Sequence, residues 1–230
     1  MFNPITDLDR LIEAILARRA GVPEHRSLLV GLSGIDGSGK GFIAKHIVAR
    51  LPQRSGSAVN LSVDDWLNLP QKRFNPDNPA DHFYRFAIRF NEMFNGLILP
   101  LRDKRTHRVV ADVAEETSNQ FKQKAFAFFD VSIIVLEGIF LFKQEFRRHF
   151  DLSIWVDCSF ETALARAIER AQEGLPPADT IRAYETIYFP AQRLHAARDN
   201  PRATADLIIN NDPVPKDMSP AAFLPELHPA

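Results

Sequence analysis

The sequence has very little cysteine and no long hydrophobic run. Cys158 is the one cysteine among 230 residues, so no disulfide can form within the chain and a reducing compartment is expected. No apolar run approaches the roughly 18–20 residues that a membrane-spanning helix needs. Residues 1–23 include acids and lack the uninterrupted apolar core of a secretory signal. These features predict a cytoplasmic protein with no membrane partner.

The sequence also lacks an excess of charge of either sign. It has 28 Lys and Arg against 29 Asp and Glu, a formal net charge of −1, so no large basic surface suggests a nucleic acid partner. There is no Asn-Lys-x-Asp segment of the kind that gives GTPases their guanine specificity, and no internal repeat. Hydrophobic residues make up 45% of the chain, which fits one globular domain with a real core.

A glycine-rich stretch lacks one expected hydroxyl. Gly34-Ile35-Asp36-Gly37-Ser38-Gly39-Lys40 has the spacing G-x-x-x-x-G-K of a phosphate-binding loop. The next residue is normally Ser or Thr, whose hydroxyl binds Mg²⁺, but here it is Gly41, followed by Phe42. Glycine lets backbone N–H groups approach a phosphate, the following helix favours anions at its N-terminus, and Lys40 adds a positive charge. A chance glycine-rich turn is the alternative, and the strand and helix expected on either side favour phosphate binding.

Short apolar segments predict the strands of a parallel sheet. They are rich in Val, Ile and Leu and lie at 28–33, 58–63, 132–138, 152–157 and 205–210. Helical segments are predicted between them, at 40–51, 80–95, 160–173 and 179–198. Near-continuous apolar strands separated by helices are typical of an α/β fold whose sheet is covered on both faces.

The remaining segments predict a single domain over residues 1–230. An amphipathic helix is expected within residues 1–20, and a long Pro- and Asn-rich loop at 68–80. Residues 99–116 are expected to form a short hairpin with a charged tip. The tail after Asp212 is rich in proline and is expected to be irregular.

Three carboxylates follow predicted strands. Asp64 and Asp65 come after the strand at 58–63, and Glu137 lies at the end of the strand at 132–138. In parallel sheets ligands bind outside the carboxyl ends of the strands, so these acids are expected near Lys40. Asp64 suits the activation of an acceptor hydroxyl and Glu137 suits Mg²⁺ binding. A turn cap is the alternative for Asp64 and Asp65.

Gly41 affects the expected metal site more than the phosphate site. Mg²⁺ keeps several waters and needs only one or two protein oxygens. We therefore expect a water, Asp64 and Glu137 to replace the missing hydroxyl. The alternative is a nucleotide-binding protein without turnover, in which Gly41 is the lesion.

Together these stretches resemble the uridine kinase/phosphoribulokinase family over about residues 28–212. "GLSGIDGSGKG" resembles the family's ATP loop, "LSVDDWL" its "QDSFY" or "QDDFF" segment, and "VLEGIFLF" its "VEGILLF". The resemblance implies a P-loop NTPase fold with a small hairpin insertion and a helical lid, here about residues 160–200. It makes Asp64 the catalytic base and Glu137 a Mg²⁺ ligand. "FDLSIWVDCSFETALARAIERA" resembles the strand and lid helix whose arginines, here Arg166 and Arg170, approach the ATP phosphates.

The resemblance also implies an acceptor site within about residues 68–116. "NPDNP" resembles "NFDHP", which places Asp77 where uridine kinases hold the ribose, and "LPLRDKRTHR" resembles "VPVYDFVTHSR". The residues expected on the acceptor side are Asp65, Asp77, Arg102, Asp103 and His107. Arg102 replaces an aromatic residue beside the base, and an arginine would suit a carboxylate or phosphate on the acceptor.

The resulting hypothesis is a kinase that uses ATP and Mg²⁺ to phosphorylate a hydroxyl of a small molecule. Uridine or cytidine is the first acceptor expected, and a sugar, a sugar acid or another ribosyl compound is the alternative. A nucleotide-binding regulator without turnover is the competing class. The sequence leaves open whether the chain forms a homo-oligomer.

Overall fold

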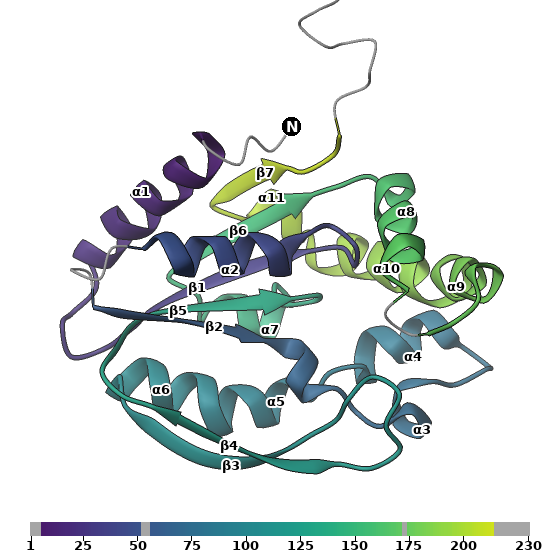
Figure 1. Ribbon diagram of the computed structural model, residues 1–230, viewed down its shortest axis with the longest axis horizontal. Helices are drawn as coiled ribbons and strands as arrows, with labels where there is room; N and C mark the ends of the chain where they lie inside the picture. The colour runs from purple at the N-terminus through teal and green to yellow at the C-terminus, as the bar shows by residue number, and fades with distance from the viewer. Residues whose placement is uncertain (1–5, 52–55, 172–173, 214–230) are drawn as a thin grey trace, which may run out of the picture.

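The computed structural model describes residues 6–51, 56–171 and 174–213 of the chain. At its centre is a five-stranded sheet in the order β2-β5-β1-β6-β7, in which all neighbouring strands run parallel (Figure 1). The strands are β1 (Leu28–Gly34), β2 (Ser57–Ser62), β5 (Val131–Gly138), β6 (Leu152–Asp157) and β7 (Leu207–Asn210). The predicted α/β fold and its five strands are confirmed.

Helices cover both faces of this sheet. On one face α1 (Thr6–Ala20) and α2 (Lys40–Arg50) pack on Leu28, Val30 and Leu32 of β1. Leu29, between them in the strand, points to the other face, because successive side chains of a strand alternate. The elements on or near that other face are η2 (Val63–Trp66), α3 (Pro70–Arg73), α4 (Pro79–Phe86), α5 (Phe90–Met93), η3 (Phe94–Ile98), α6 (Leu99–Lys104) and α7 (Gln144–Arg147).

The predicted lid region consists of consecutive helices. They are α8 (Phe160–Arg170), α9 (Pro177–Ala183), η4 (Tyr184–Tyr188) and α10 (Phe189–Asp199), followed by the short α11 (Pro201–Thr204). Ser159 caps α8, since its side chain accepts a hydrogen bond from the Thr162 N–H at 3.2 Å. The helices predicted at 160–173 and 179–198 are confirmed up to Arg170 and from Pro177, while residues 172–173 lie outside the described residues.

Two prolines follow π-helical turns. Pro100 comes directly after η3 and Leu99, and Pro190 comes directly after η4 and Phe189. A proline ring inside an α-helix clashes with the carbonyl four residues earlier and donates no hydrogen bond. The wider π-turn changes this local spacing, so the helix continues through the proline. The helix predicted at 80–95 is wrong in its bounds, since α4 ends at Phe86. A second helical segment begins at Phe90 and, because of the π-turn before Pro100, continues to Lys104.

The hairpin predicted at 99–116 is displaced for the same reason. Residues 99–104 are helical, and the hairpin is formed by β3 (His107–Val113) and β4 (Lys122–Phe128), which pair antiparallel. The second strand has the sequence KQKAFAF, in which the lysines interrupt the apolar residues that predict a strand. The predicted 68–80 loop is also shorter, because α3 interrupts it and α4 begins at Pro79 with Asn78 as its cap.

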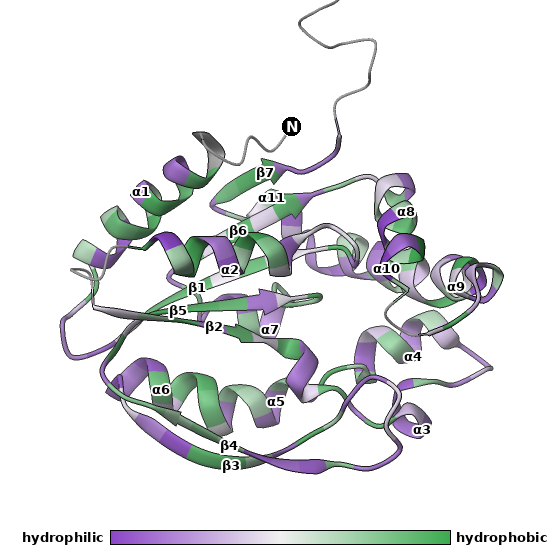
Figure 2. Ribbon diagram, in the orientation of Figure 1, coloured by the Kyte–Doolittle hydropathy of each residue, from purple (hydrophilic) through white to green (hydrophobic). Residues whose placement is uncertain are grey.

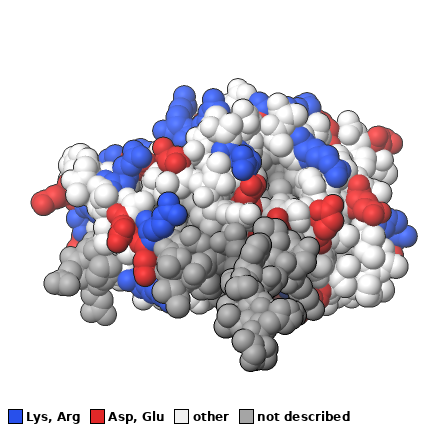
Figure 3. All heavy atoms as spheres, turned by 90° about the horizontal axis from the view of Figure 1, so that it is seen from above, with Lys and Arg blue, Asp and Glu red and all other residues white. Residues whose placement is uncertain are grey.

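The surface of the described residues has no dominant charge on the side drawn in Figure 3, where basic and acidic side chains are mixed. The central strands are strongly apolar, whereas β3 and β4 alternate between apolar and polar residues (Figure 2). In the described part of the chain, no helix is both long and apolar enough to cross a membrane. The helix expected within residues 1–20 is confirmed as α1, while residues 1–5 and the tail from residue 214 fall outside the described residues.

Candidate active site

The glycine-rich loop joins β1 to α2 and requires glycine where φ is positive. Gly37 has a φ of 76° and Gly39 a φ of 87°, a region that other residues rarely adopt. A Cβ at Gly37 would also lie 2.5 Å from the carbonyl oxygen of Ala163 in α8. The loop leads into α2, and N–H groups in the first turn of a helix have no intrahelical acceptor. The structure therefore has the loop-to-helix geometry expected of a phosphate-binding loop, with Ile35 in the core and Phe42 exposed beside it.

Arg166 and Asn211 hold this loop through its carbonyl oxygens. Arg166 Nη1 lies 3.3 Å from the oxygen of Gly37 and 3.4 Å from that of Ser38, while its Nη2 donates to the oxygen of Asn211 at 2.7 Å. The Asn211 side chain donates to the Ser38 carbonyl at 2.7 Å. Arg166 thus positions the loop in this structure, and its contact with ATP phosphates stays a prediction.

Asp36 lies at the centre of an ion cluster beside the loop. Its carboxylate accepts hydrogen bonds from the Tyr184 hydroxyl and, at 2.9 Å, from the Gly37 N–H, and Arg170 Nη2 lies 3.7 Å away. Burial opposes ionisation of Asp36, but the charges of Lys40 and Arg170, followed by these two hydrogen bonds, hold its pKa below the usual value. Asp36 is therefore an anion that pairs with Arg170 and is stabilised by the charge of Lys40, the two cations expected to meet phosphate.

Asp64 follows β2 directly, in the turn η2. Its backbone N–H donates to the Ser62 hydroxyl at 3.2 Å, which fixes the start of the turn. The Asp64 side chain is accessible to solvent, yet enough protein surrounds it for desolvation to raise its pKa. The charge of Lys40 opposes this effect and the charge of Asp36 adds to it. A raised pKa brings the carboxylate nearer to the range that suits a general base.

Glu137 is buried at the end of β5 and lies beside Gly41. Its exposed fraction is 7%. Burial raises the Glu137 pKa, while Lys40 and a hydrogen bond from Ser62 act in the opposite direction. A Cβ added to Gly41 would lie 3.7 Å from each carboxylate oxygen of Glu137, an ordinary van der Waals distance. The residue that lacks a hydroxyl and the predicted metal ligand are thus neighbours.

These residues fit a Mg²⁺ ion. Glu137 and Asp64 supply carboxylate oxygens, which Mg²⁺ prefers, and the space beside Gly41 borders both oxygens of Glu137. Among the described residues no group of three or more His, Cys, Asp or Glu forms a ready-made cage. Such a cage is not expected, because Mg²⁺ bound with a nucleotide takes most of its ligands from water and phosphate.

The hairpin and α3 contribute charged groups near this cluster. Lys124 Nζ lies 2.7 Å from Asp65 Oδ1, so β4 is tied to the residue after Asp64. Arg73, which is 3% exposed, donates to the carbonyl oxygen of Glu116 in the connection between β3 and β4. Burial opposes the charge of Arg170, but Asp36 and, more weakly, Glu116 and Asp64 raise its pKa. The P-loop, the β2 turn and the hairpin therefore converge on Arg170.

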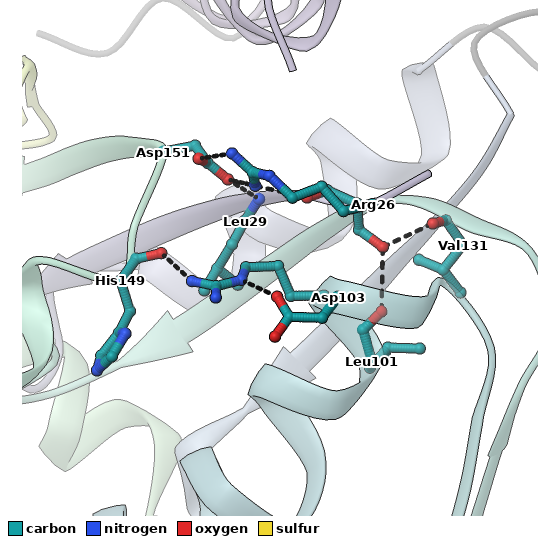
Figure 4. Close-up of polar contacts among 9 residues, drawn as sticks. Arg26, Leu29, Leu101, Asp103, Val131, His149 and Asp151 are labelled. Carbon is teal, nitrogen blue, oxygen red and sulfur yellow. Dashed lines mark hydrogen bonds and ion pairs between the residues drawn. The ribbon is translucent and has the colours of Figure 1, made fainter. Parts of the chain in front are cut away.

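Arg102 and Asp103 lie at the amino-terminal edge of the sheet, because Arg102 contacts Ser27 and His149 there, and Figure 4 shows Asp103 and His149 close together. Arg102 donates to Asp103 at 2.8 Å and to the carbonyl oxygen of His149 at 3.2 Å, and its own carbonyl accepts from the Ser27 N–H. Ser27 and His149 precede β1 and β6, whereas the P-loop follows β1. The structure does not bring these two predicted acceptor residues to the candidate site, because α6 replaces the strand that was expected there.

His107 begins β3 and contacts the π-helical turn η3. Its Nε2 lies 2.9 Å from the carbonyl oxygen of Gly96. Pro100, four residues after Gly96, has no N–H to donate to that carbonyl, so His107 supplies a donor instead. Asp77 is exposed before α4, where its backbone N–H is bound by the Asn75 side chain at 2.9 Å. Within the described residues, Asp77 makes no ion pair with the cluster around Asp36.

Several residues of the site were not predicted from the sequence. Tyr184 lies in a helix 148 residues after Asp36, and Asn211 lies 173 residues after Ser38. Arg73, Glu116 and Lys124 reach the site from α3 and the hairpin. Only the structure marks the segment of Tyr184, which forms a π-turn before Pro190, and such turns are frequent at functional sites.

A family model described as "Phosphoribulokinase / Uridine kinase family" matches residues 29–174, more than half of the chain. No curated protein sequence gives a significant match. Among solved structures, a possible uridine kinase from Bacillus stearothermophilus is 21% identical, with a TM-score of 0.70, over 88% of this chain and 96% of that one. D-glycerate 3-kinase from Cryptococcus neoformans var. grubii is 10% identical, with a TM-score of 0.57, over 88% and 95%. At these identities the structural matches establish the fold.

Proposed function

Since the chain belongs to the phosphoribulokinase/uridine kinase family, and is thus a P-loop kinase of small molecules that uses ATP, we propose that it transfers the γ-phosphate to an acceptor hydroxyl activated by Asp64. The observation that carries the proposal is the grouping of Asp64, Lys40 and Glu137 at the carboxyl edge of the sheet, where burial raises the pKa of both carboxyl groups and the charge of Lys40 opposes this rise. This arrangement supports phosphoryl transfer because the reaction needs positioning and charge stabilisation rather than a covalent intermediate.

Each residue of the group has a distinct role. Asp64 accepts the proton of the attacking hydroxyl, and its raised pKa suits that step. Lys40 and Arg170 stabilise the charge that develops on the transferred phosphoryl group. Glu137 and Asp64 would hold Mg²⁺, which when bound neutralises phosphate charge. Asp36 keeps Arg170 beside the loop until phosphate replaces it as the partner of that cation.

A pyrimidine nucleoside is the first acceptor that we propose, on the strength of the family. The contacts of Arg102 favour a second candidate, a sugar or sugar acid, because the resemblance put this residue beside the base and its guanidinium binds Asp103 and the His149 carbonyl instead. The names of similar proteins include both a possible uridine kinase and a D-glycerate kinase. A cytoplasmic location, suggested by the single cysteine, stays part of the proposal.

The test is ADP release from ATP and Mg²⁺ over a panel of acceptors containing uridine, cytidine, pentoses and glycerate. Turnover stimulated by one class of acceptor and lost in Asp64→Asn would establish the kinase and its substrate class. Asp103→Asn is the matched control, since it makes the same chemical change at the opposite edge of the sheet. ATP binding without stimulation by any acceptor would favour the nucleotide-binding regulator instead.

A further inference from the structure

The two faces of the β3–β4 hairpin have different surroundings. Cross-strand partners in an antiparallel pair lie on the same face, and successive pairs alternate between faces. The pairs Val109 with Phe126 and Ala111 with Lys124 belong to the inner face, where Phe126 is buried in the core and Lys124 reaches Asp65. The pairs on the other face, which we call the outer face, are Arg108–Ala127, Val110–Ala125 and Asp112–Gln123.

The outer face is apolar at its centre and exposed. Val110 is 60% exposed, and Phe129, which follows β4, is 57% exposed. Ala125 and Ala127 lie beside them and are exposed as well. The hairpin runs along the margin of the molecule, with α5 and α6 on its inner side (Figure 1). Exposed apolar side chains grouped on one face of a sheet are typical of a contact surface.

The charges on this face are self-complementary. Arg108 and Asp112 lie two residues before and two residues after Val110 in β3, on the same face. Consider a second copy that is related to the first by a two-fold axis through Val110. If this axis lies in the interface and is perpendicular to the strands, Arg108 of each copy meets Asp112 of the other. Within the described chain, neither Arg108 nor Asp112 has an ion-pair partner of its own. Arg108 instead lies over the Phe129 ring, 4.6 Å from its centroid.

We propose that the outer face of the hairpin is an isologous contact between two copies of this chain, with Val110 and Ala125 at its centre and two Arg108–Asp112 pairs at its ends. The small side chains of Ala125 and Ala127 let two sheet faces approach to about 10 Å, the usual packing distance. A two-stranded hairpin offers a small surface, so the dimer is weak and forms at high protein concentration. This proposal is independent of the reaction catalysed.

The contact lies close to the candidate active site. Lys124 is next to Ala125 in β4 and its side chain points to the opposite face, where it binds Asp65. A second copy against the outer face restrains the strand that carries Lys124. Assembly and the acceptor side of the site thus share one two-stranded element.

Charge-reversal variants test the proposal. Their self-association is measured by sedimentation velocity over about 5–300 µM protein, a range that suits a weak dimer. We expect self-association in the unmodified chain and about tenfold weaker association in Arg108→Asp and in Asp112→Arg, because each places like charges together at both ends of the contact. The double variant Arg108→Asp/Asp112→Arg restores the pairs and should associate as the unmodified chain does.

Lys104→Asp is the control for Arg108→Asp, because it also replaces a cation with an anion, at an exposed position of α6. It should leave association unchanged, and thermal melts would verify that all variants fold. A chain that stays monomeric over the whole range would overturn the proposal. So would a dimer that neither single reversal weakens, or one that the double variant fails to restore.

Discussion

The Cβ position of Gly41 lies 3.7 Å from both carboxylate oxygens of Glu137. A serine or threonine at residue 41 therefore fits without a clash, and its hydroxyl would stand beside the predicted metal ligand. This relationship explains how a P-loop can lack the usual hydroxyl and keep space for a water in its place.

Gly41→Thr is expected to lower the Mg²⁺ concentration for half-maximal activity several-fold, without creating activity in an inert protein. Gly41→Ala is the control, since it should stabilise α2 by about 0.5–1 kcal/mol without supplying a metal ligand. Mg²⁺ titrations of ADP release would compare the two. If Gly41→Thr turned an inactive protein into a kinase, the loss of turnover would instead be due to Gly41.

Asp64→Asn is expected to lower kcat by about 10²–10⁴-fold while leaving the affinity for ATP nearly unchanged. Because the Asp64 pKa is raised above its ordinary 3.8, kcat/KM of the unmodified chain should fall as the pH drops through that raised value. A pH profile of kcat/KM would reveal this acid limb. A profile that stays flat down to the ordinary pKa would exclude Asp64 as the base.

Glu137→Gln is expected to raise Tm by a few degrees at neutral pH in the absence of metal. The Glu137 pKa is raised in the fold, so the folded chain binds this proton more tightly than the unfolded chain does. The stability gained by protonation is fully present below the ordinary pKa of 4.5 and is lost as the pH rises through the raised value. Thermal melts in EDTA should thus show a difference between variant and unmodified chain that shrinks toward pH 4.5. A difference independent of pH would contradict this account.

Tyr184→Phe removes the hydroxyl that donates to Asp36 and is expected to destabilise the fold by about 1 kcal/mol. Without this bond Asp36 pairs more strongly with Lys40 and Arg170, so ATP should bind about three- to tenfold more weakly, as expected for about 1 kcal/mol. Tyr84→Phe is the matched control. The Tyr84 hydroxyl also donates to a carboxylate, that of Asp199 at 2.6 Å, but this bond is not part of the P-loop cluster. Calorimetric ATP titrations would separate the two variants. Equal ATP affinities would show that Asp36 and Tyr184 do not affect the nucleotide.

Arg102→Ala is expected to leave kcat and the acceptor KM unchanged, because Arg102 contacts Asp103 and His149 at the amino-terminal edge of the sheet. Its cost in stability should be below about 1 kcal/mol, as for other partly exposed ion pairs. Arg170→Ala, at the P-loop, should lower kcat by about 10²-fold. Steady-state kinetics of both variants would test the assignment. A raised acceptor KM in Arg102→Ala would restore that residue to the acceptor site.

The sequence by itself determined the elements whose signals are local. The spacing from Gly34 to Lys40 predicts the loop because positive φ values and close backbone approach require glycine there. Apolar runs predict the strands, since a sheet buried on both faces needs apolar residues at every position. Asp64 and Glu137 could be assigned to one edge because each follows a strand and parallel strands end together.

Tertiary structure alone decided which distant side chains complete the site. The α6 helix continues through Pro100 because a π-turn precedes it, and this places Arg102 at the amino-terminal edge of the sheet, away from the P-loop. The bond between Tyr184 and Asp36 depends on the packing of the lid helices, which no local pattern encodes. Periodicity and turn residues report the conformation of neighbouring residues, whereas such contacts depend on how separate elements pack together.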